Sequence, residues 1–204
     1  AVVWADPARG LLVTEYICGA HLRISDIRLP ENIECLAARL RELHSSSIEG
    51  SFLDIPRIAN HYSTITNTVQ SRELYGELSK LLKRLRSDLT ESVFCHNDLG
   101  YRNIIHTRKI MFLDWEYSAA GDPWFELAGI VRQNRFSAIQ SRNLLYAYCG
   151  TFDKQMERRL YLFSRLYDLV SALWYLVVCA TNTDDMTNGR QLKRILDHLD
   201  NYPA

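Results

Sequence analysis

The sequence lacks the features that mark several specialised classes of protein. Its 204 residues include only five cysteines, at positions 18, 35, 95, 149 and 179, and none form a CxxC pair. An odd and scattered set argues against a disulfide framework or a zinc site, and it favours reduced thiols in a cytoplasmic protein. The 24 basic and 24 acidic residues cancel. No net charge therefore draws the chain to nucleic acid or to a membrane surface.

Long apolar runs and targeting signals are also missing. The opening "AVVWADPARG" has no basic stretch followed by an apolar run, so we expect no secretory leader. The most apolar segment, residues 169–180, falls short of the roughly 20 residues that a membrane-spanning helix needs. We interpret this segment as part of a buried helix and expect no membrane span.

Helical periodicity is the strongest pattern that the chain does show. Leucine and isoleucine residues recur on one helical face in several segments. Asp122 suits a helix N-cap, Pro123 suits the first helical position, and Gly150 could serve as a C-cap. Residues 61–70 are ambiguous. The predicted helices cover residues 29–46, 71–89, 122 onward, 141–150, 153–182 and 188–202.

Short strands are predicted only at the start and in the middle of the chain. Residues 10–19 form an apolar run bounded by glycines, which is typical of a strand. Residues 92–96 form a second short strand. Residues 103–106 and 109–115 read as two strands joined by a tight connection. The fold class is therefore α+β and mostly helical, with a small hairpin near its middle.

Polar residues within the hairpin region raise a physical question. Asp98, Asn103 and Asp114 stand among isoleucine, leucine, phenylalanine and tryptophan. Burying an unpaired carboxylate costs several kcal/mol. A hairpin brings its ends together, so Asp114 can approach Asn103, and their oxygen atoms suit Mg²⁺. Asp98 could accept a proton from a hydroxyl. A lone loop aspartate is usually a turn former, but this three-part spacing is far more specific and matches a phosphoryl-transfer site.

Two segments carry a family resemblance. "CHNDLGYRNII" and "MFLDWEYSAAGDPWFELA" resemble the catalytic and metal-binding segments of choline kinases and aminoglycoside phosphotransferases. The pattern is most similar to bacterial choline/ethanolamine kinases, and thiamine kinases are close to it. The resemblance covers nearly the whole chain. It implies a protein-kinase-like fold and ATP-dependent phosphorylation of the hydroxyl of a small cationic amino alcohol, choline or ethanolamine.

The resemblance also implies roles for individual residues. Asp98 would be the catalytic base, and Asn103 and Asp114 would hold Mg²⁺ between the ATP phosphates. His96 and Asp122 would support the loop; Asp122 serves better as a helix cap. Glu126 would make an internal hydrogen bond. The residues that would meet adenine at the hinge, chiefly through their backbone, are Glu15, Tyr16 and Ile17.

The acceptor residues follow from the charge of the substrate. A quaternary ammonium binds over aromatic faces, and the candidates are Tyr117, Trp124 and Trp174, with Glu116 supplying negative charge. Trp174 and Tyr175 could equally be core residues of a buried helix, and Tyr175 fits the core better. Choline kinases commonly carry a second tryptophan where this chain has Ser171. Asp168 could add charge or pair with Arg165 or another basic residue.

One departure from the family concerns the smaller lobe of the kinase fold. No lysine precedes Lys80, and no glycine-rich loop precedes the hinge. We therefore expect residues 1–19 to be a hinge strand with a remnant of the lobe connection, and residues 20–204 to be the C-terminal helical lobe. Apolar surface near Val13, Tyr16 and Ile17 should be exposed and could support self-association. The alternatives are a non-catalytic kinase-like binding module, a truncated lobe, or a thiamine or aminoglycoside kinase.

Overall fold

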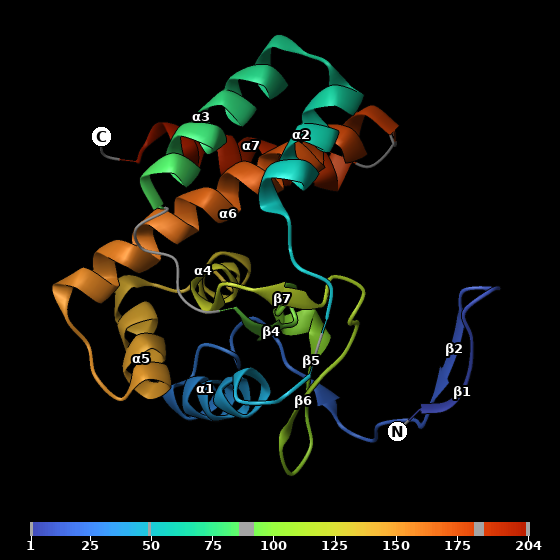
Figure 1. Cartoon of the computed structure of the whole chain (residues 1–204). Coiled ribbons are helices and arrows are strands. Elements are labelled where there is room, and N and C mark those ends of the chain that lie inside the picture. Colours follow the sequence, from blue (N-terminus) through green and yellow to red (C-terminus); the bar gives the residue numbers. More distant parts are fainter. Residues whose placement is uncertain (1, 49, 86–91, 182–185, 203–204) are drawn as a thin grey trace.

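The structure is a computed structural model that describes residues 2–48, 50–85, 92–181 and 186–202. It confirms a mostly helical α+β fold (Figure 1). The helices are α1 (Pro30–His44), α2 (Ile55–Thr66), α3 (Val69–Leu85), α4 (Pro123–Gln133), α5 (Ala138–Cys149), α6 (Lys154–Thr181) and α7 (Met186–Asp200). The strands are β1 (Val2–Asp6), β2 (Leu11–Thr14), β3 (Ala20–His21), β4 (Val93–Cys95), β5 (Ile104–His106), β6 (Ile110–Phe112) and β7 (Ala119–Gly121).

Within the described residues, the strands form three small antiparallel sheets. β1 pairs with β2, β4 pairs with β7, and β3, β5 and β6 form a three-stranded sheet in that order. The predicted central hairpin is confirmed as β5 and β6, with Ile104 opposite Phe112. The predicted strand over residues 10–19 is shorter, because only Leu11–Thr14 pairs, and its partner β1 was not foreseen. Since β3 pairs with β5, residue 20 already belongs to the central sheet.

The helices surround a core centred on α4. Every residue from Trp124 to Val131 is buried, so α4 contributes all of its faces to the interior. The long helix α6 packs against α4 and also against α2, α3 and α7, while α1 packs against α5 (Figure 1). The β1–β2 hairpin stands away from this body. Strand β4, which leads into the loop that holds Asp98, packs against α1 and α4 of this body.

Local sequence signals set the helix ends as expected. The Asp122 carboxylate accepts a hydrogen bond of 2.9 Å from the backbone N–H of Trp124, and Pro123 occupies the first turn of α4. Gly150 adopts a left-handed conformation at the end of α5. Leu74, Leu78 and other leucines of α3 are buried on one stripe, as predicted. Residues 86–89 of that predicted helix lie outside the described residues.

Helix α6 is longer than the apolar segment within it. It is long and apolar enough, by length and composition alone, to cross a membrane, and 44% of its most apolar window is buried. Core helices of globular proteins pass the same test. Within residues 169–180, Leu169, Ala172 and Leu173 are buried, the other residues up to 179 are half-buried and Ala180 is exposed, so the predicted buried helix is confirmed only in part.

Candidate active site

The loop that follows β4 holds Asp98 in a fixed orientation. Asn103 lies at the end of a short 3-10 turn, Tyr101–Asn103, which returns the chain toward Asp98. The Asn103 side-chain N–H₂ donates to the Asp98 carboxylate at 2.7 Å and to the Asp98 backbone carbonyl at 2.9 Å. Gln133, at the end of α4, donates to the other Asp98 oxygen at 2.8 Å. Both carboxylate oxygens are therefore positioned by neutral amide donors.

The hairpin places the second carboxylate beside this loop. The Leu113 N–H donates to the Asn103 carbonyl at 2.9 Å, which joins the two ends of the β5–β6 hairpin. Asp114 follows directly, is exposed, and has a left-handed backbone with a φ of 64°. Asn103 commits its nitrogen to Asp98, so its amide oxygen remains for another partner. An amide oxygen and an exposed carboxylate at one hairpin end are hard donors that fit Mg²⁺.

His96 links the loop that holds Asp98 to the strand end that precedes Asp114. Its ring is fully buried, with Nε2 at 2.7 Å from the Leu113 carbonyl and Nδ1 at 3.3 Å from the Asp98 N–H. This arrangement requires a neutral ring that donates from Nε2 and accepts at Nδ1. His96 therefore supports the loop, as predicted, and ties the backbone of Asp98 to the residue before Asp114.

The buried carboxylate of Glu126 supports the backbone of the loop that follows β4. One oxygen of Glu126 accepts hydrogen bonds of 2.8 Å from the backbone N–H groups of His96 and Asn97. The other lies 2.5 Å from His44 Nε2, and His44 Nδ1 lies 2.6 Å from the Tyr148 hydroxyl. The predicted internal hydrogen bond of Glu126 is confirmed. The helical spacing of Ile33, Leu36, Leu40 and His44 in α1 could have pointed to His44.

His44 and Glu126 also form a group with Cys95, and all three side chains are of types that ligate metals. His44, Cys95 and Glu126 are buried, and their ligand atoms lie within 4.8 Å of one another. Burial raises the pKa of the Cys95 thiol, and the nearby negative charge of Glu126 raises it further. Because Glu126 already accepts from two backbone groups and faces His44, this cluster serves to hold the loop.

Aromatic rings pack around the strand end that precedes Asp114. The Trp115 ring stacks on Phe94 and lies 4.6 Å from the His96 ring, centroid to centroid. Its indole N–H donates to the Phe112 carbonyl at 3.1 Å. The sequence pattern did not point to a role for Trp115. Its packing fixes the strand end that precedes Asp114.

The negative charge of Asp98 contributes to raised pKa values of three tyrosines. Burial raises the pKa of Tyr167 and of Tyr175, and the negative charge of Asp98 raises both further. Burial also raises the pKa of Tyr117, with smaller contributions from Glu116, Tyr62 and Asp98. The Trp174 ring meets the Tyr175 ring edge to face, with centroids 4.7 Å apart. Tyr167 and Tyr175 on α6 and Tyr117 in the loop before β7 therefore lie close enough to Asp98 to be affected by its charge.

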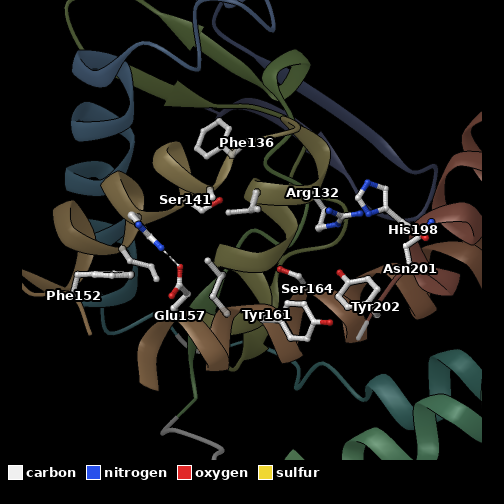
Figure 2. Close-up of a pocket in the computed structure, with 15 residues that line it drawn as sticks. Arg132, Phe136, Ser141, Phe152, Glu157, Tyr161, Ser164, His198, Asn201 and Tyr202 are labelled. Carbon is white, nitrogen blue, oxygen red and sulfur yellow. Dashed lines mark hydrogen bonds and ion pairs between the residues drawn. The ribbon is translucent and has the colours of Figure 1, made fainter. Parts of the chain in front are cut away.

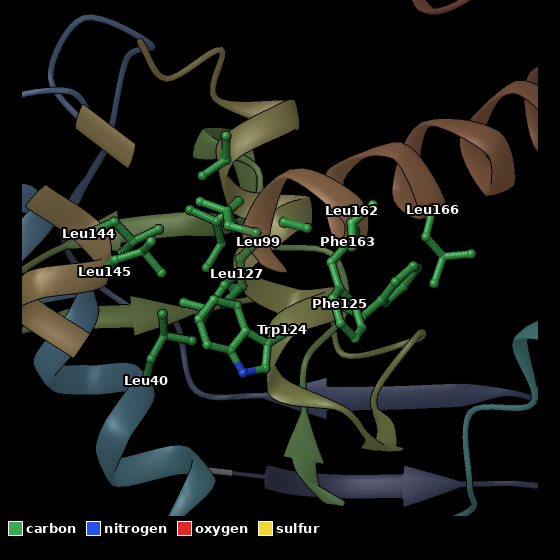
Figure 3. Close-up of a cluster of buried hydrophobic side chains, with 14 of the residues drawn as sticks. Leu40, Leu99, Trp124, Phe125, Leu127, Leu144, Leu145, Leu162, Phe163 and Leu166 are labelled. Carbon is green, nitrogen blue, oxygen red and sulfur yellow. The ribbon is translucent and has the colours of Figure 1, made fainter. Parts of the chain in front are cut away.

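Trp124 and Asp168 have structural positions. Trp124 is 8% exposed in the core among leucine side chains, with the Arg159 guanidinium 4.8 Å from its ring centroid (Figure 3). This burial gives Trp124 a packing role and separates it from the other acceptor candidates. Asp168 is buried and pairs with Arg132 at 2.7 Å. Arg165 contacts Glu77 instead.

The predicted hinge is an exposed segment. Glu15, Tyr16 and Ile17 follow β2 without regular structure. The Tyr16 side chain is 91% exposed and that of Val13 is 47% exposed. The expected apolar exposure is confirmed at Val13 and Tyr16, whereas Ile17 is half-buried, and the exposed surface continues onto Trp4 and Leu12 of the β1–β2 hairpin.

A separate cavity of about 390 Å³ is lined mainly by residues of α4, α5, α6 and α7 (Figure 2). Phe136, Tyr161 and Tyr202 line it together with Arg132. Asp98, Asn103 and Asp114 do not line it. Its arginines are paired, since Arg132 contacts Asp168 and Arg142 contacts Glu157 at 2.8 Å. The cavity is therefore distinct from the Asp98 site.

Comparisons with known proteins agree with this geometry. The choline/ethanolamine kinase family matches residues 9–133. Protein LicA of Haemophilus influenzae is 25% identical over 162 residues, which cover 73% of this chain and 59% of that protein. The chain spans about half of the length of the curated relatives that it matches.

Solved structures show the same fold. A choline/ethanolamine kinase family protein from Mesorhizobium loti superposes with a TM-score of 0.86 at 24% identity, covering 100% of this chain and 74% of that one. Choline kinase LicA from Streptococcus pneumoniae gives a TM-score of 0.84 at 21% identity, covering 99% and 74%. A further structure of LicA is a complex with AMP. With 125 of 204 residues (9–133) matched by the family, this chain belongs to the choline/ethanolamine kinase family.

Proposed function

We propose that this chain is the larger lobe of a kinase that transfers the γ-phosphate of ATP to the hydroxyl of a small amino alcohol, choline or ethanolamine. The observation that carries the proposal is the Asp98 carboxylate, held at 2.7 Å by Asn103 in the loop that His96 ties to the Asp114 strand. These contacts support a site in which Asp98 would be the proton acceptor and Asn103 and Asp114 would offer oxygen atoms to a metal. This arrangement suits phosphoryl transfer, which relies on positioning and charge stabilisation.

The residues of this chain would divide the work as follows. Asp98 accepts hydrogen bonds at both oxygens, but a carboxylate has about four acceptor positions, so it can still orient an alcohol and take its proton. Bound ATP and Mg²⁺ would supply the phosphoryl group and neutralise its charge. Asn103 and Asp114 would hold that ion through their oxygen atoms. The backbone of Glu15 to Ile17 would meet the adenine.

The acceptor site would lie among the aromatic residues near Asp98. Tyr117 is 43% exposed, Glu116 is exposed beside it, and Trp174 contacts Tyr175 on α6. A cation over aromatic faces gains about 0.5–2 kcal/mol. Trp124 does not enter this proposal, because the core encloses it. Glu116, Tyr117 and Trp174 would bind the ammonium group.

The remaining sequence predictions fit within this proposal. A reducing, cytoplasmic setting is part of the proposal and rests on the odd and scattered set of five cysteines. The division into a hinge segment, residues 1–19, and a helical lobe, residues 20–204, would follow the point where β3 joins the central sheet. The exposed apolar hinge face would contact either a second lobe or a second copy of the chain.

The test is product identification with the protein as its gene encodes it. ATP and Mg²⁺ would be incubated separately with choline, ethanolamine, thiamine and an aminoglycoside, and the products would be identified by mass spectrometry. We expect a phosphorylated amino alcohol and one ADP for each product. Phosphorylation of thiamine or the aminoglycoside alone would overturn the acceptor assignment. Nucleotide binding without any transfer would favour the non-catalytic alternative.

A further inference from the structure

Gln133 is the last residue of α4, and its carboxamide lies between two groups of the site. Its side-chain nitrogen is 2.8 Å from one Asp98 oxygen and 2.6 Å from the Tyr167 hydroxyl oxygen. A carboxylate only accepts hydrogen bonds, so the nitrogen end of the amide must face Asp98. Both amide protons are then donated, one to Asp98 and one to Tyr167.

The surrounding backbone leaves space for this contact. Gly100, two residues after Asp98, is buried, and a Cβ at this position would overlap the Gln133 side-chain oxygen. A Cβ at Gly129, one turn before Gln133, would lie 2.8 Å from the Tyr167 ring. The two glycines therefore let the Gln133 and Tyr167 side chains approach the catalytic loop and α4.

Gln133 also shares a helix face with Glu126. The two residues are seven positions apart, which is about two turns of α4. Glu126 holds the backbone of the catalytic loop, and Gln133 holds the side chain of Asp98. The same face of one buried helix thus fixes both the path of the loop and the orientation of its carboxylate.

We propose that Gln133 is a positioning residue that holds the Asp98 carboxylate in the orientation needed to receive the proton of the acceptor alcohol. The proposal rests on the proposed function. Asn103 fixes one carboxylate oxygen, and Gln133 fixes the other, so loss of Gln133 lets the carboxylate rotate about its Cβ–Cγ bond. Reacting groups that move by about 1 Å can lose on the order of 100-fold in rate.

The test uses two substitutions that remove one contact by different routes. Gln133→Leu deletes the donor. Gly100→Ala retains the glutamine but displaces its carboxamide, because the added Cβ would overlap the carboxamide oxygen. We expect each to lower kcat for the amino alcohol by about 10- to 100-fold, with the KM for ATP within about twofold of wild type. The double variant should be no slower than the slower single variant, because both remove the same hydrogen bond. Gly76→Ala on α3, where a Cβ meets nothing within 4 Å, is the matched control.

The outcomes separate this inference from the proposed function. A Gln133→Leu enzyme with wild-type kcat, or multiplicative losses in the double variant, would overturn the positioning role. Losses in kcat that merely follow a lower melting temperature would also count against it. If the wild-type protein phosphorylates no acceptor, the proposed function fails, and crystal structures still decide the inference. We then expect the Asp98 carboxylate to rotate in Gly100→Ala, and an unchanged carboxylate would overturn the proposal.

Discussion

The loop that follows β4 and the β1–β2 hairpin differ in how far their groups are hydrogen-bonded or buried within the lobe. In the loop, Asp98, His96 and the backbone of Asn97 all bond within the lobe. In the hairpin, the side chains of Trp4, Leu12 and Val13 are about half exposed or more. Unpartnered apolar surface of this kind marks an interface, whereas hydrogen bonds within a polar network orient its side chains. Under the proposed function, the chain would build the base and metal positions by itself, and the adenine side would be completed by contact with another surface.

The largest expected effect removes the chemistry of the loop while preserving its shape. Asp98→Asn retains the size of the side chain but loses the proton acceptor and the charge. We expect kcat to fall by about 10²–10⁴-fold, the usual contribution of a general base, with ATP affinity little changed. Steady-state kinetics with choline and ethanolamine would measure this. Wild-type turnover in the variant would remove Asp98 from the catalytic role.

The second prediction tests whether the loop depends on its buried support. Glu126→Ala would leave two backbone N–H groups and His44 without their acceptor. Each unsatisfied buried group costs about 1–3 kcal/mol, so the free energy of unfolding should fall by about 3 kcal/mol or more. Urea unfolding would measure the change. Glu157→Ala, which breaks an exposed pair with Arg142, should cost no more than about 1 kcal/mol. Equal costs for both variants would contradict the account.

The third prediction concerns Asp114, a proposed ligand of Mg²⁺ at the end of the β5–β6 hairpin. Asp114→Asn removes a ligand charge but keeps an oxygen atom. Groups one layer outside a metal commonly contribute about 10–100-fold in affinity, so loss of a direct ligand charge should weaken Mg²⁺-dependent ATP binding by at least about 10-fold. Calorimetric titration with and without Mg²⁺ would measure it. A variant with unchanged Mg²⁺ dependence would show that the ion binds elsewhere.

The fourth prediction sharpens the acceptor side. Trp174→Ala should raise the KM for choline by about 2- to 30-fold, which corresponds to the loss of about 0.5–2 kcal/mol of cation–π energy. The uncharged analogue 3,3-dimethylbutanol should be affected less, since it has no charge to lose. Equal effects on both alcohols would assign Trp174 to packing alone.

The smallest expected effect lies in the hairpin region. Tyr16→Ser changes a side chain that is 91% exposed, so the free energy of unfolding should change by no more than about 0.5 kcal/mol. Self-association of the 204-residue chain, measured by light scattering, should nevertheless weaken because the apolar face is reduced. A monomeric wild-type chain would rule out association through this face.

Sequence patterns predicted the parts of the fold that depend on local chemistry. The long helices follow their apolar spacing, and Asp122 caps α4 as its position before Pro123 indicates. Strand β7 was missed because "AAG" has no strand preference, and its pairing with β4 defines it. The contacts of Gln133, His44 and Tyr148 join residues far apart in the chain, so only the packed structure reveals them. Trp124 was placed near the acceptor because aromatic type alone does not separate a pocket from a core.

The most direct test of the account is a crystal structure of the protein, as its gene encodes it, with Mg²⁺ and a non-hydrolysable ATP analogue. We expect the Asn103 side-chain oxygen and the Asp114 carboxylate to bind one Mg²⁺ at about 2.0–2.1 Å, with Asp98 outside its coordination shell and facing the γ-phosphate. An ion bound by Asp98 instead, or Asn103 and Asp114 facing away from the nucleotide, would contradict the proposed division between base and metal ligands.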